Sequence, residues 1–405
     1  MTTRLFGLHR TVLVMAGTHF IVDGYGNILA PLLPILIPRL GLTLAAAGAL
    51  QMCFQLANSV AQLGFGHIAD RWRPRVLLVA GPVLCVTMLP LIGLTSNFTV
   101  LAAVLIAGGL GGAAFHPPAA ALVHRYSGNQ RGLAMSFHIT SGTLGQALAP
   151  LVFAPFVQRF GLGATFVLIA PALVVLGAGL LRRMPAIDRL QESDHAGGIA
   201  ALRPYARPLT LLYVIVVLRT LTAVSFSTFV PVMLTMRGQT LAQAGSAVSV
   251  YLVAVGLGGF FGGPLADKFG ARRVIIVSLV SAVPLLALAP QLSGWMFVAT
   301  LAAGGFLLQS TLPVNVTFAQ TIAPISAATV SSLMMGFAWG MGSVCAPFVG
   351  MLADRIGIAS TLTTMSTLPL AAAALAWPLP AGKHVPHVAG GGIVTPESVR
   401  MDVAD

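Results

Sequence analysis

Twelve apolar runs, each long enough to cross a bilayer, constrain this chain more than any other feature of its sequence. A membrane-spanning helix needs about 20 mostly apolar residues, because lipid offers no partner to unpaired backbone N–H and C=O groups. Charged residues make up 8% of the 405 residues, against about 25% in soluble domains. This excludes a soluble globular enzyme, a disordered chain and a porin-type barrel, and it predicts an all-α membrane protein. The expected spans are 11–37, 43–66, 76–95, 98–123, 132–157, 163–181, 208–235, 241–265, 273–291, 295–318, 328–352 and 359–379.

These spans form two sets of six that are copies of each other. Four landmarks recur 196 or 197 residues later: Gly66-x-x-x-Asp70-Arg71 as Gly263-x-x-x-Asp267-Lys268, Gly108-Gly109 as Gly304-Gly305, Pro117 as Pro313, and Gly145-x-x-x-Ala149-Pro150 as Gly342-x-x-x-Ala346-Pro347. Two six-helix halves related by a repeat are typical of secondary transporters, whose binding site lies between the halves. We expect an N-terminal half at 1–183, a cytoplasmic linker at 184–206, a C-terminal half at 207–379 and a disordered cytoplasmic tail at 380–405.

The basic residues predict the orientation of the chain in the membrane. With twelve spans both termini lie on one side, and 17 of the 22 Lys and Arg residues gather on that side. The opposite loops hold four, namely Arg39, Arg159, Arg237 and Arg355. Because cytoplasmic loops are enriched in Lys and Arg, both termini are expected in the cytoplasm. The net charge of +12 therefore reflects topology and does not indicate a nucleic-acid partner.

Two repeated segments carry a family resemblance. They are Gly66-His-Ile-Ala-Asp70-Arg71-Trp-Arg-Pro-Arg75 and Gly263-Pro-Leu-Ala-Asp267-Lys268-Phe-Gly-Ala-Arg272-Arg273. Both resemble the signature that members of the major facilitator superfamily carry after spans two and eight. Four segments resemble the fosmidomycin-resistance branch of this superfamily: Arg73-Pro74, His19-Phe-Ile-Val-Asp23, Phe115-His116-Pro117 and Gly336-Phe-Ala-Trp-Gly-Met-Gly342. The resemblance implies the major facilitator fold, alternating access and export of a small molecule in exchange for protons.

The chain also departs from that branch. Pro118 stands where an acidic residue usually follows the His-Pro of span four, and span four lacks the arginine of many exporters. Span five resembles the antiporter signature, but Leu151-Val-Phe-Ala154 lacks its trailing glycine pair. These departures leave open a second interpretation, a proton-coupled uptake permease for an organic anion or other nutrient.

Asp23 in span one and Arg219 in span seven are the two charged residues deep inside spans. Such residues are costly in lipid and usually face a cavity or a partner. Their separation of 196 residues is the repeat offset, so they occupy equivalent positions in the two halves. We expect them to pair or nearly pair in one state, with Asp23 coupling protons and Arg219 holding an anionic substrate group. The alternative is a static ion pair that keeps the halves in register.

Three histidines are further candidates. His19 precedes Asp23 by four residues and shares its helix face, so a proton-coupling role and a structural hydrogen bond are both plausible. His116 is expected to line the cavity, and His138 either lines it or only bonds a neighbouring helix. No metal site is expected, because no histidine has a second histidine four residues away or a cluster of carboxylates nearby. The three isolated cysteines predict no disulfide, and we expect no cofactor.

An amide stripe runs down one face of span two: Gln51, Gln55, Asn58 and Gln62. Amides in a membrane helix need partners or water. The first three are candidate substrate-binding residues, and the alternative is that the stripe joins span two to a neighbouring helix, at about 0.6 kcal/mol for each hydrogen bond.

The repeated loop signature predicts a cytoplasmic gate made of Gly66, Asp70, Arg71, Gly263, Asp267, Lys268 and Arg272. In the family this loop holds the cytoplasmic side closed, with the carboxylate at a helix N-terminus of the other half. Such a contact is worth about 0.3–1 kcal/mol, so it can break in each cycle. The sequence thus predicts a monomeric, multi-pass transporter of the bacterial inner membrane. We expect proton-coupled efflux of a drug or metabolite, with antibiotic resistance as its phenotype, and no enzymatic activity.

Overall fold

The computed structural model describes residues 4–5, 8–71, 74–128, 130–181, 199–323, 330, 333–380, 388–389 and 392–393. The N-terminal half contains β1 (Arg4–Leu5), β2 (Leu8–His9), α1 (Arg10–Gly26), α2 (Leu29–Leu40), α3 (Leu44–Ser59), α4 (Ala61–Arg71), α5 (Pro74–Met88), η1 (Leu89–Leu94), α6 (Phe98–Tyr126), α7 (Arg131–Phe160), η2 (Leu162–Leu168), α8 (Ile169–Leu176) and η3 (Gly177–Leu181). The C-terminal half contains η4 (Ile199–Tyr205), α9 (Ala206–Met236), α10 (Leu241–Phe269), α11 (Ala271–Leu288), η5 (Ala289–Gln291), α12 (Gly294–Gln309), α13 (Thr311–Ile322), η7 (Leu333–Phe337), α15 (Ala338–Val344), α16 (Ala346–Ile356), α17 (Ile358–Met365) and α18 (Leu368–Ala376).

The prediction of an all-α membrane protein with two six-helix halves is confirmed. Ten segments of the described chain are long and apolar enough, by length and composition, to cross a membrane. The other two expected spans correspond to α7, a continuous helix of 30 residues, and to η7, α15 and α16. Span five carries several polar side chains, and α7 packs between α1 and α10; His138 is buried there, whereas Ser136 and Thr140 are exposed.

Polar residues in the loops start several of the long helices. Thr240 and Gln243 form a capping box at α10, in which each side chain accepts a hydrogen bond from the other residue's backbone N–H. Asn97 accepts from the Val100 N–H at the start of α6, at 3.0 Å. These caps satisfy backbone donors that the first turn of a helix leaves unpaired.

The predicted linker and tail lie largely outside the described residues. From Ile199 the structure has η4, and α9 begins at Ala206, one residue before the predicted start of the C-terminal half. Within the tail, β3 (Val388–Ala389) and β4 (Gly392–Ile393) pair in antiparallel fashion.

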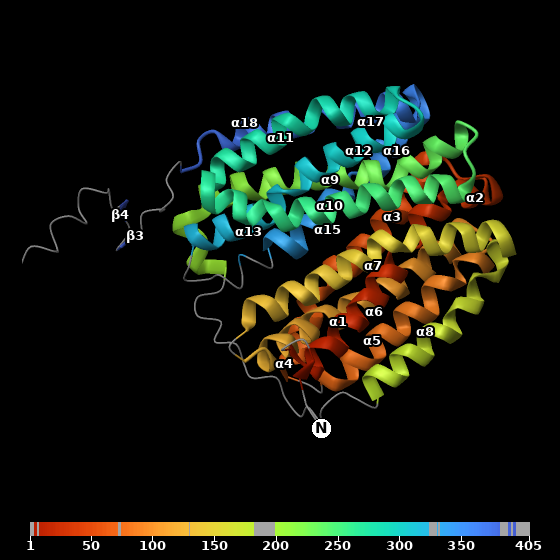
Figure 1. Ribbon diagram of the computed structural model, residues 1–405, viewed down its shortest axis with the longest axis horizontal. Helices are drawn as coiled ribbons and strands as arrows, with labels where there is room; N and C mark the ends of the chain where they lie inside the picture. Colours follow the sequence, from red (N-terminus) through yellow and green to blue (C-terminus); the bar gives the residue numbers. More distant parts are fainter. Residues whose placement is uncertain are drawn as a thin grey trace, which may run out of the picture.

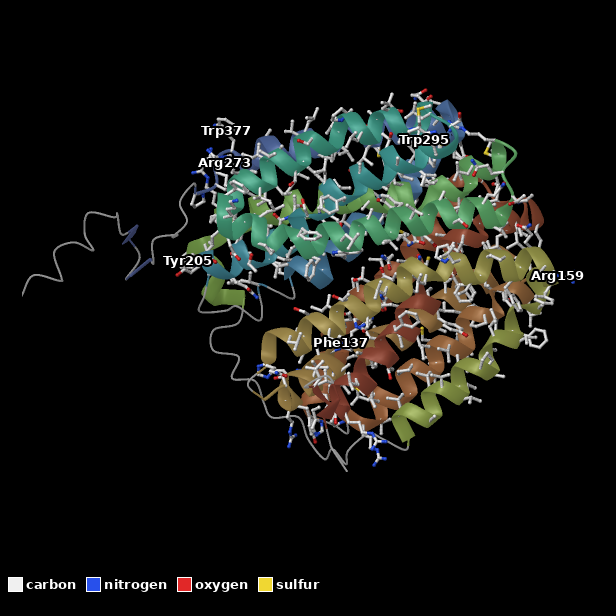
Figure 2. The ribbon with its side chains drawn as sticks, viewed as in Figure 1. Phe137, Arg159, Tyr205, Arg273, Trp295 and Trp377 are labelled. Atoms are coloured by element: carbon white, nitrogen blue, oxygen red, sulfur yellow. The ribbon has the colours of Figure 1, made fainter. Side chains whose placement is uncertain are left out.

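The two halves lie side by side and diverge toward one end of the molecule (Figure 1). We call the end with α4 and α13 the open end, and the end with α2, α16 and α17 the closed end. Exposed tryptophans and arginines mark both: Trp377 and Arg273 lie at the open end, Trp295 and Arg159 at the closed end (Figure 2). Aromatic and cationic side chains are typical of the two membrane–water interfaces.

Glycines show how closely the two halves approach each other at each end. A Cβ added to Gly48 of α3 would lie 2.2 Å from the carbonyl oxygen of Ala346 in the opposite half. A Cβ added to Gly350 of α16 would lie 2.2 Å from the Leu44 oxygen. At the open end, by contrast, a Cβ on Gly64 or Gly263 would meet no atom within 4 Å. The backbones of the two halves therefore touch at the closed end.

Candidate functional site

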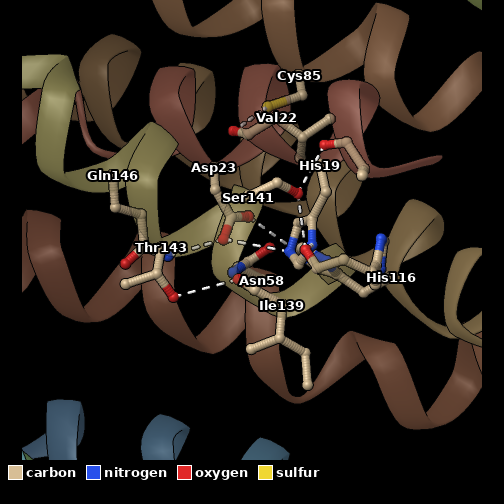
Figure 3. A network of polar contacts seen from close by, with 12 residues as sticks. His19, Val22, Asp23, Asn58, Cys85, His116, Ile139, Ser141, Thr143 and Gln146 are labelled. Atoms are coloured by element: carbon tan, nitrogen blue, oxygen red, sulfur yellow. Dashed lines mark hydrogen bonds and ion pairs between the residues drawn. The ribbon is translucent and has the colours of Figure 1, made fainter. Parts of the chain in front are cut away.

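Asp23 is the centre of a polar cluster inside the N-terminal half (Figure 3). Its Oδ2 lies 3.3 Å from His19 Nε2, one turn earlier on α1, and its Oδ1 lies 3.5 Å from His116 Nε2 on α6. Gln146 of α7 donates a hydrogen bond from Nε2 to Oδ2 at 2.9 Å. The side chains of His19, Asp23 and His116 are 12%, 13% and 17% exposed. Three helices thus supply partners to one nearly buried carboxylate.

His138 holds His19 in place from the neighbouring helix. Its carbonyl oxygen lies 2.8 Å from His19 Nδ1, and the two rings lie 4.3 Å apart between centroids. Since a carbonyl oxygen only accepts, Nδ1 of His19 must carry the proton. Nε2 is then the nitrogen that faces Asp23. Ser141, three residues after His138 on α7, donates to the carbonyl oxygens of Ala16 and His138, at 2.8 Å each.

Glycines bring α1 and α7 close enough for these contacts. A Cβ on Gly142 would lie 2.6 Å from His19 Nε2 and 2.8 Å from Asp23 Oδ2. A Cβ on Gly145 would lie 2.0 Å from the carbonyl oxygen of Phe20. The small residues of span five therefore make room for the cluster. Gln146 was not singled out from the sequence, although it directly follows Gly145; a polar residue beside the small-residue motif is the signal that could have found it.

One group of side chains in the described part of the chain has a ligand geometry that the sequence did not lead us to expect. His19, Asp23 and His116 each offer one ligand atom, and these three atoms lie within 4.8 Å of one another. His116 is far from Asp23 in the sequence, so spacing rules for metal motifs do not detect the group. Helix packing alone brings these residues together.

Arg219 lies in the C-terminal half with partners of its own. It is 0% exposed, and its guanidinium donates through Nη1 to Gln309 Oε1 and through Nη2 to Thr220 Oγ1, the latter at 3.1 Å. Its Cζ lies 5.7 Å from the ring centroid of Trp339. The expected pair with Asp23 is not formed in this structure. No carboxylate pairs with Arg219 in the part of the chain that the structure describes, and its Nε has no hydrogen-bond partner there.

The amide stripe of α3 and α4 is half-buried. Asn58 lies nearest the cluster, since a Cβ on Gly112 of α6 would lie 2.4 Å from its Oδ1 and 3.8 Å from His116 Nε2. Gln62 donates to the Asn58 carbonyl oxygen at 2.7 Å, so the amide at the α4 end of the stripe bonds within its own span. Gln51 and Gln55 are half-buried on α3.

The predicted gate residues lie at the open end. The side chains of Asp70 and Arg71 are outside the described part of the structure. Asp267 and Lys268 are exposed at the end of α10, where Lys268 Nζ lies 5.2 Å from the Phe269 ring centroid. Arg272 packs over Trp377, with Cζ 5.4 Å from the ring centroid. Gly66 faces α6, its virtual Cβ 3.7 Å from Pro117.

A contact of the kind expected at the gate is present at the closed end. Asp354 of α16 accepts hydrogen bonds from the Leu44 and Ala45 N–H groups at the start of α3, both at 3.0 Å. In the other copy of the repeat, Gln158 of α7 accepts from the Ala242 N–H at the start of α10, at 2.9 Å. These two contacts, which we call the end caps, join opposite halves. The excess of basic residues, which predicts the orientation of these loops, does not single out Asp354.

Removing one end cap should loosen the closed end. Replacing an N-cap acceptor by alanine costs about 0.5–2 kcal/mol, so Asp354→Ala should shift the ratio of closed to open molecules by about 2- to 30-fold. Distances between spin labels on cysteines replacing Arg159 and Trp295, one exposed residue in each half at this end, would measure the shift. Asp354→Asn keeps one acceptor oxygen and should give a smaller change. Identical distance distributions for Asp354→Ala and the unmutated chain would contradict this role.

Comparisons with known proteins agree with this architecture. The family model described as Major Facilitator Superfamily matches residues 15–240 and 212–396. The uncharacterized MFS-type transporter YfnC of Bacillus subtilis (strain 168) is 31% identical over 376 residues, covering 89% of this chain and 90% of that protein. The fosmidomycin resistance protein of Escherichia coli (strain K12) is 29% identical, with 87% and 88% covered. The solved inward-facing structure of a bacterial homologue of the human lysosomal transporter Spinster superposes with a TM-score of 0.74 at 17% identity, with 90% and 95% covered.

Proposed function

Because this chain belongs to the Major Facilitator Superfamily, whose members are transporters and not enzymes, we propose that it exports a small polar or anionic molecule in exchange for protons by alternating access. The observation that carries the proposal is the nearly buried Asp23 carboxylate, held by His19, His116 and Gln146. A carboxylate inside a membrane protein is costly unless it has partners or a function in ion transfer. The family resemblance read from the motifs is confirmed by the match to the fosmidomycin resistance protein.

Protonation of Asp23 changes what it can bind. The charged carboxylate accepts from Gln146 of α7 and attracts the two imidazoles, whereas the neutral acid holds all three partners less strongly. Further along, α7 packs on α10 of the opposite half, where a Cβ on Gly245 would lie 2.8 Å from the Pro150 carbonyl oxygen. Packed residues of α7 therefore connect Asp23 to the interface between the halves. We propose that this connection couples proton binding, with His19 as proton relay, to the opening of the closed end.

The surroundings of Arg219 support the proposal that the substrate carries an anionic group. A buried cation without a carboxylate partner is unfavourable by several kcal/mol, and a substrate anion would relieve that cost. Since Trp339 lies over the guanidinium, its side chain must move before a substrate reaches Arg219. In the N-terminal half, His116, His138, Gln51, Gln55 and Asn58 are proposed to contact the substrate's polar groups.

We further propose a bacterial inner-membrane location with both termini in the cytoplasm, and the gate of Asp70 and Asp267 as the contact that closes the open end in another state. The excess of Lys and Arg on the side of the termini supports this orientation, and the bacterial relatives support the location. We expect a monomer to suffice, because one chain supplies both halves of the site.

Expression in an efflux-deficient bacterial host, followed by growth on a panel of toxic compounds, tests the direction of transport. Export predicts resistance to at least one compound, and a proton uncoupler should remove that resistance. The uptake permease, which the incomplete antiporter signature of span five leaves open, predicts hypersensitivity to a toxic nutrient analogue instead. No response in cells, together with no substrate-linked proton movement in proteoliposomes, would count against transport altogether.

A further inference from the structure

We propose that His19, Asp23 and His116 also form a binding site for a divalent first-row transition-metal ion of the zinc class. The three side chains come from two helices, α1 and α6, and their ligand atoms lie within 4.8 Å of one another. All three are mostly buried. The inference is independent of the direction and the substrate of transport, since it concerns binding alone.

The distances in the cluster suit such an ion. Bonds of about 2.0–2.2 Å from zinc to imidazole nitrogen and carboxylate oxygen place neighbouring ligand atoms of a tetrahedral ion about 3.3–3.5 Å apart. His19 Nε2 lies 3.3 Å from Asp23 Oδ2, and His116 Nε2 lies 3.5 Å from Asp23 Oδ1. The two imidazoles face different oxygens of Asp23, and the three ligand atoms lie within 4.8 Å of one another, so the side chains would rearrange to share one ion.

The hydrogen bonds around His19 direct its Nε2 at Asp23. With its proton on Nδ1, which faces the His138 carbonyl oxygen at 2.8 Å, a neutral His19 directs the lone pair of Nε2 at a carboxylate oxygen. A metal ion between these two electron-rich atoms, like a proton on Nε2, would remove the repulsion between them. A metal-bound histidine almost always donates its second ring N–H to a carbonyl or carboxylate, and His19 has this arrangement. Gln146 supplies the corresponding hydrogen bond to the carboxylate at 2.9 Å.

The donor set selects the class of ion. Two imidazole nitrogens and one carboxylate suit zinc, cobalt, nickel and iron(II), whereas magnesium and calcium prefer oxygen ligands alone. Three protein ligands leave at least one coordination position for water or another ligand. A bound ion would tie α1 to α6 and occupy Asp23, so on the basis of the proposed function it should also inhibit proton-coupled transport.

Cobalt(II) is the probe, since its visible absorption reports coordination and its affinity can be titrated on the full-length purified protein. We expect one ion per chain, displaced by Zn²⁺, with intense visible bands and no near-ultraviolet thiolate band. The last point separates this site from one that uses Cys85, whose Sγ lies 3.6 Å from the Val22 carbonyl oxygen. His116→Gln and Asp23→Asn should each weaken binding by more than the roughly 10- to 100-fold that loss of an outer-shell partner costs.

His124→Gln is the matched control, because His124 is exposed on the same helix eight residues after His116. It should bind Co²⁺ like the unmutated protein, and Zn²⁺ should raise the Tm of both proteins. If a ligand variant is not monodisperse on gel filtration, Gln146→Leu provides the second test. It removes the hydrogen bond to Asp23 and should bind Co²⁺ about 10-fold more weakly than the unmutated protein. Co²⁺ bands that are unchanged in His116→Gln, Asp23→Asn or, where that variant is needed, Gln146→Leu would overturn the proposal, as would a thiolate band.

Discussion

Asp23→Asn should reduce proton-driven transport to the rate measured without a proton gradient, while exchange of labelled for unlabelled substrate continues. Asparagine has nearly the same shape as aspartate but never carries the charge, so the cluster stays in one state throughout the cycle. The contact with Gln146, now 2.9 Å, can persist through the amide oxygen, which still accepts a hydrogen bond. Proteoliposomes with an imposed pH gradient, compared with counterflow in the absence of a gradient, separate the two activities.

Arg219→Gln is the contrasting variant for this experiment. It removes the buried cation of the other half and should reduce counterflow and gradient-driven transport together, because substrate binding is common to both. If Asp23→Asn transports at full rate in response to the gradient, Asp23 does not couple protons to transport. Such a result would leave membership of the family untouched.

Gly48→Ala should open the closed end and cause a large loss of transport, even though it adds only one methyl group. Alanine in a helix is normally more favourable than glycine by about 0.8–1 kcal/mol. Here the new Cβ would lie 2.2 Å from the Ala346 carbonyl oxygen and 2.9 Å from the Pro347 nitrogen, so the opposing backbone must move. Overpacking of this kind costs about 1–3 kcal/mol, a shift of about 5- to 150-fold in the population of closed molecules.

The same spin-label pair at positions 159 and 295 measures this shift, as longer distances between the halves. Gly64→Ala is the matched control, since Gly64 belongs to the same predicted span and a Cβ there meets no atom within 4 Å. It should leave the distances at the closed end unchanged. Equal behaviour of the two alanine variants would show that the close approach at Gly48 does not hold the closed end together.

The end caps show which contacts can be predicted from a repeat in the sequence and which cannot. The offset of 196 residues relates Gln158 to Asp354, so their equivalence could have been predicted. That each side chain reaches a helix N-terminus of the opposite half could not, because neither its length nor its sequence neighbours encode which helix lies across the interface. The same holds for Asp23 and Arg219: their equivalence was predicted, but their partners lie within their own halves.

By itself, the amino-acid sequence determined that this chain crosses the membrane as helices in two copied halves, and that an acid and a base lie within them. These properties follow from local chemistry, since apolar length and backbone hydrogen bonding leave lipid-embedded residues few alternatives. The tertiary structure decided that His116 and Gln146 meet Asp23, that Arg219 stays apart from it, and which end is closed. Such contacts join residues about 90 to 310 positions apart, and they depend on where small residues allow helix backbones to approach.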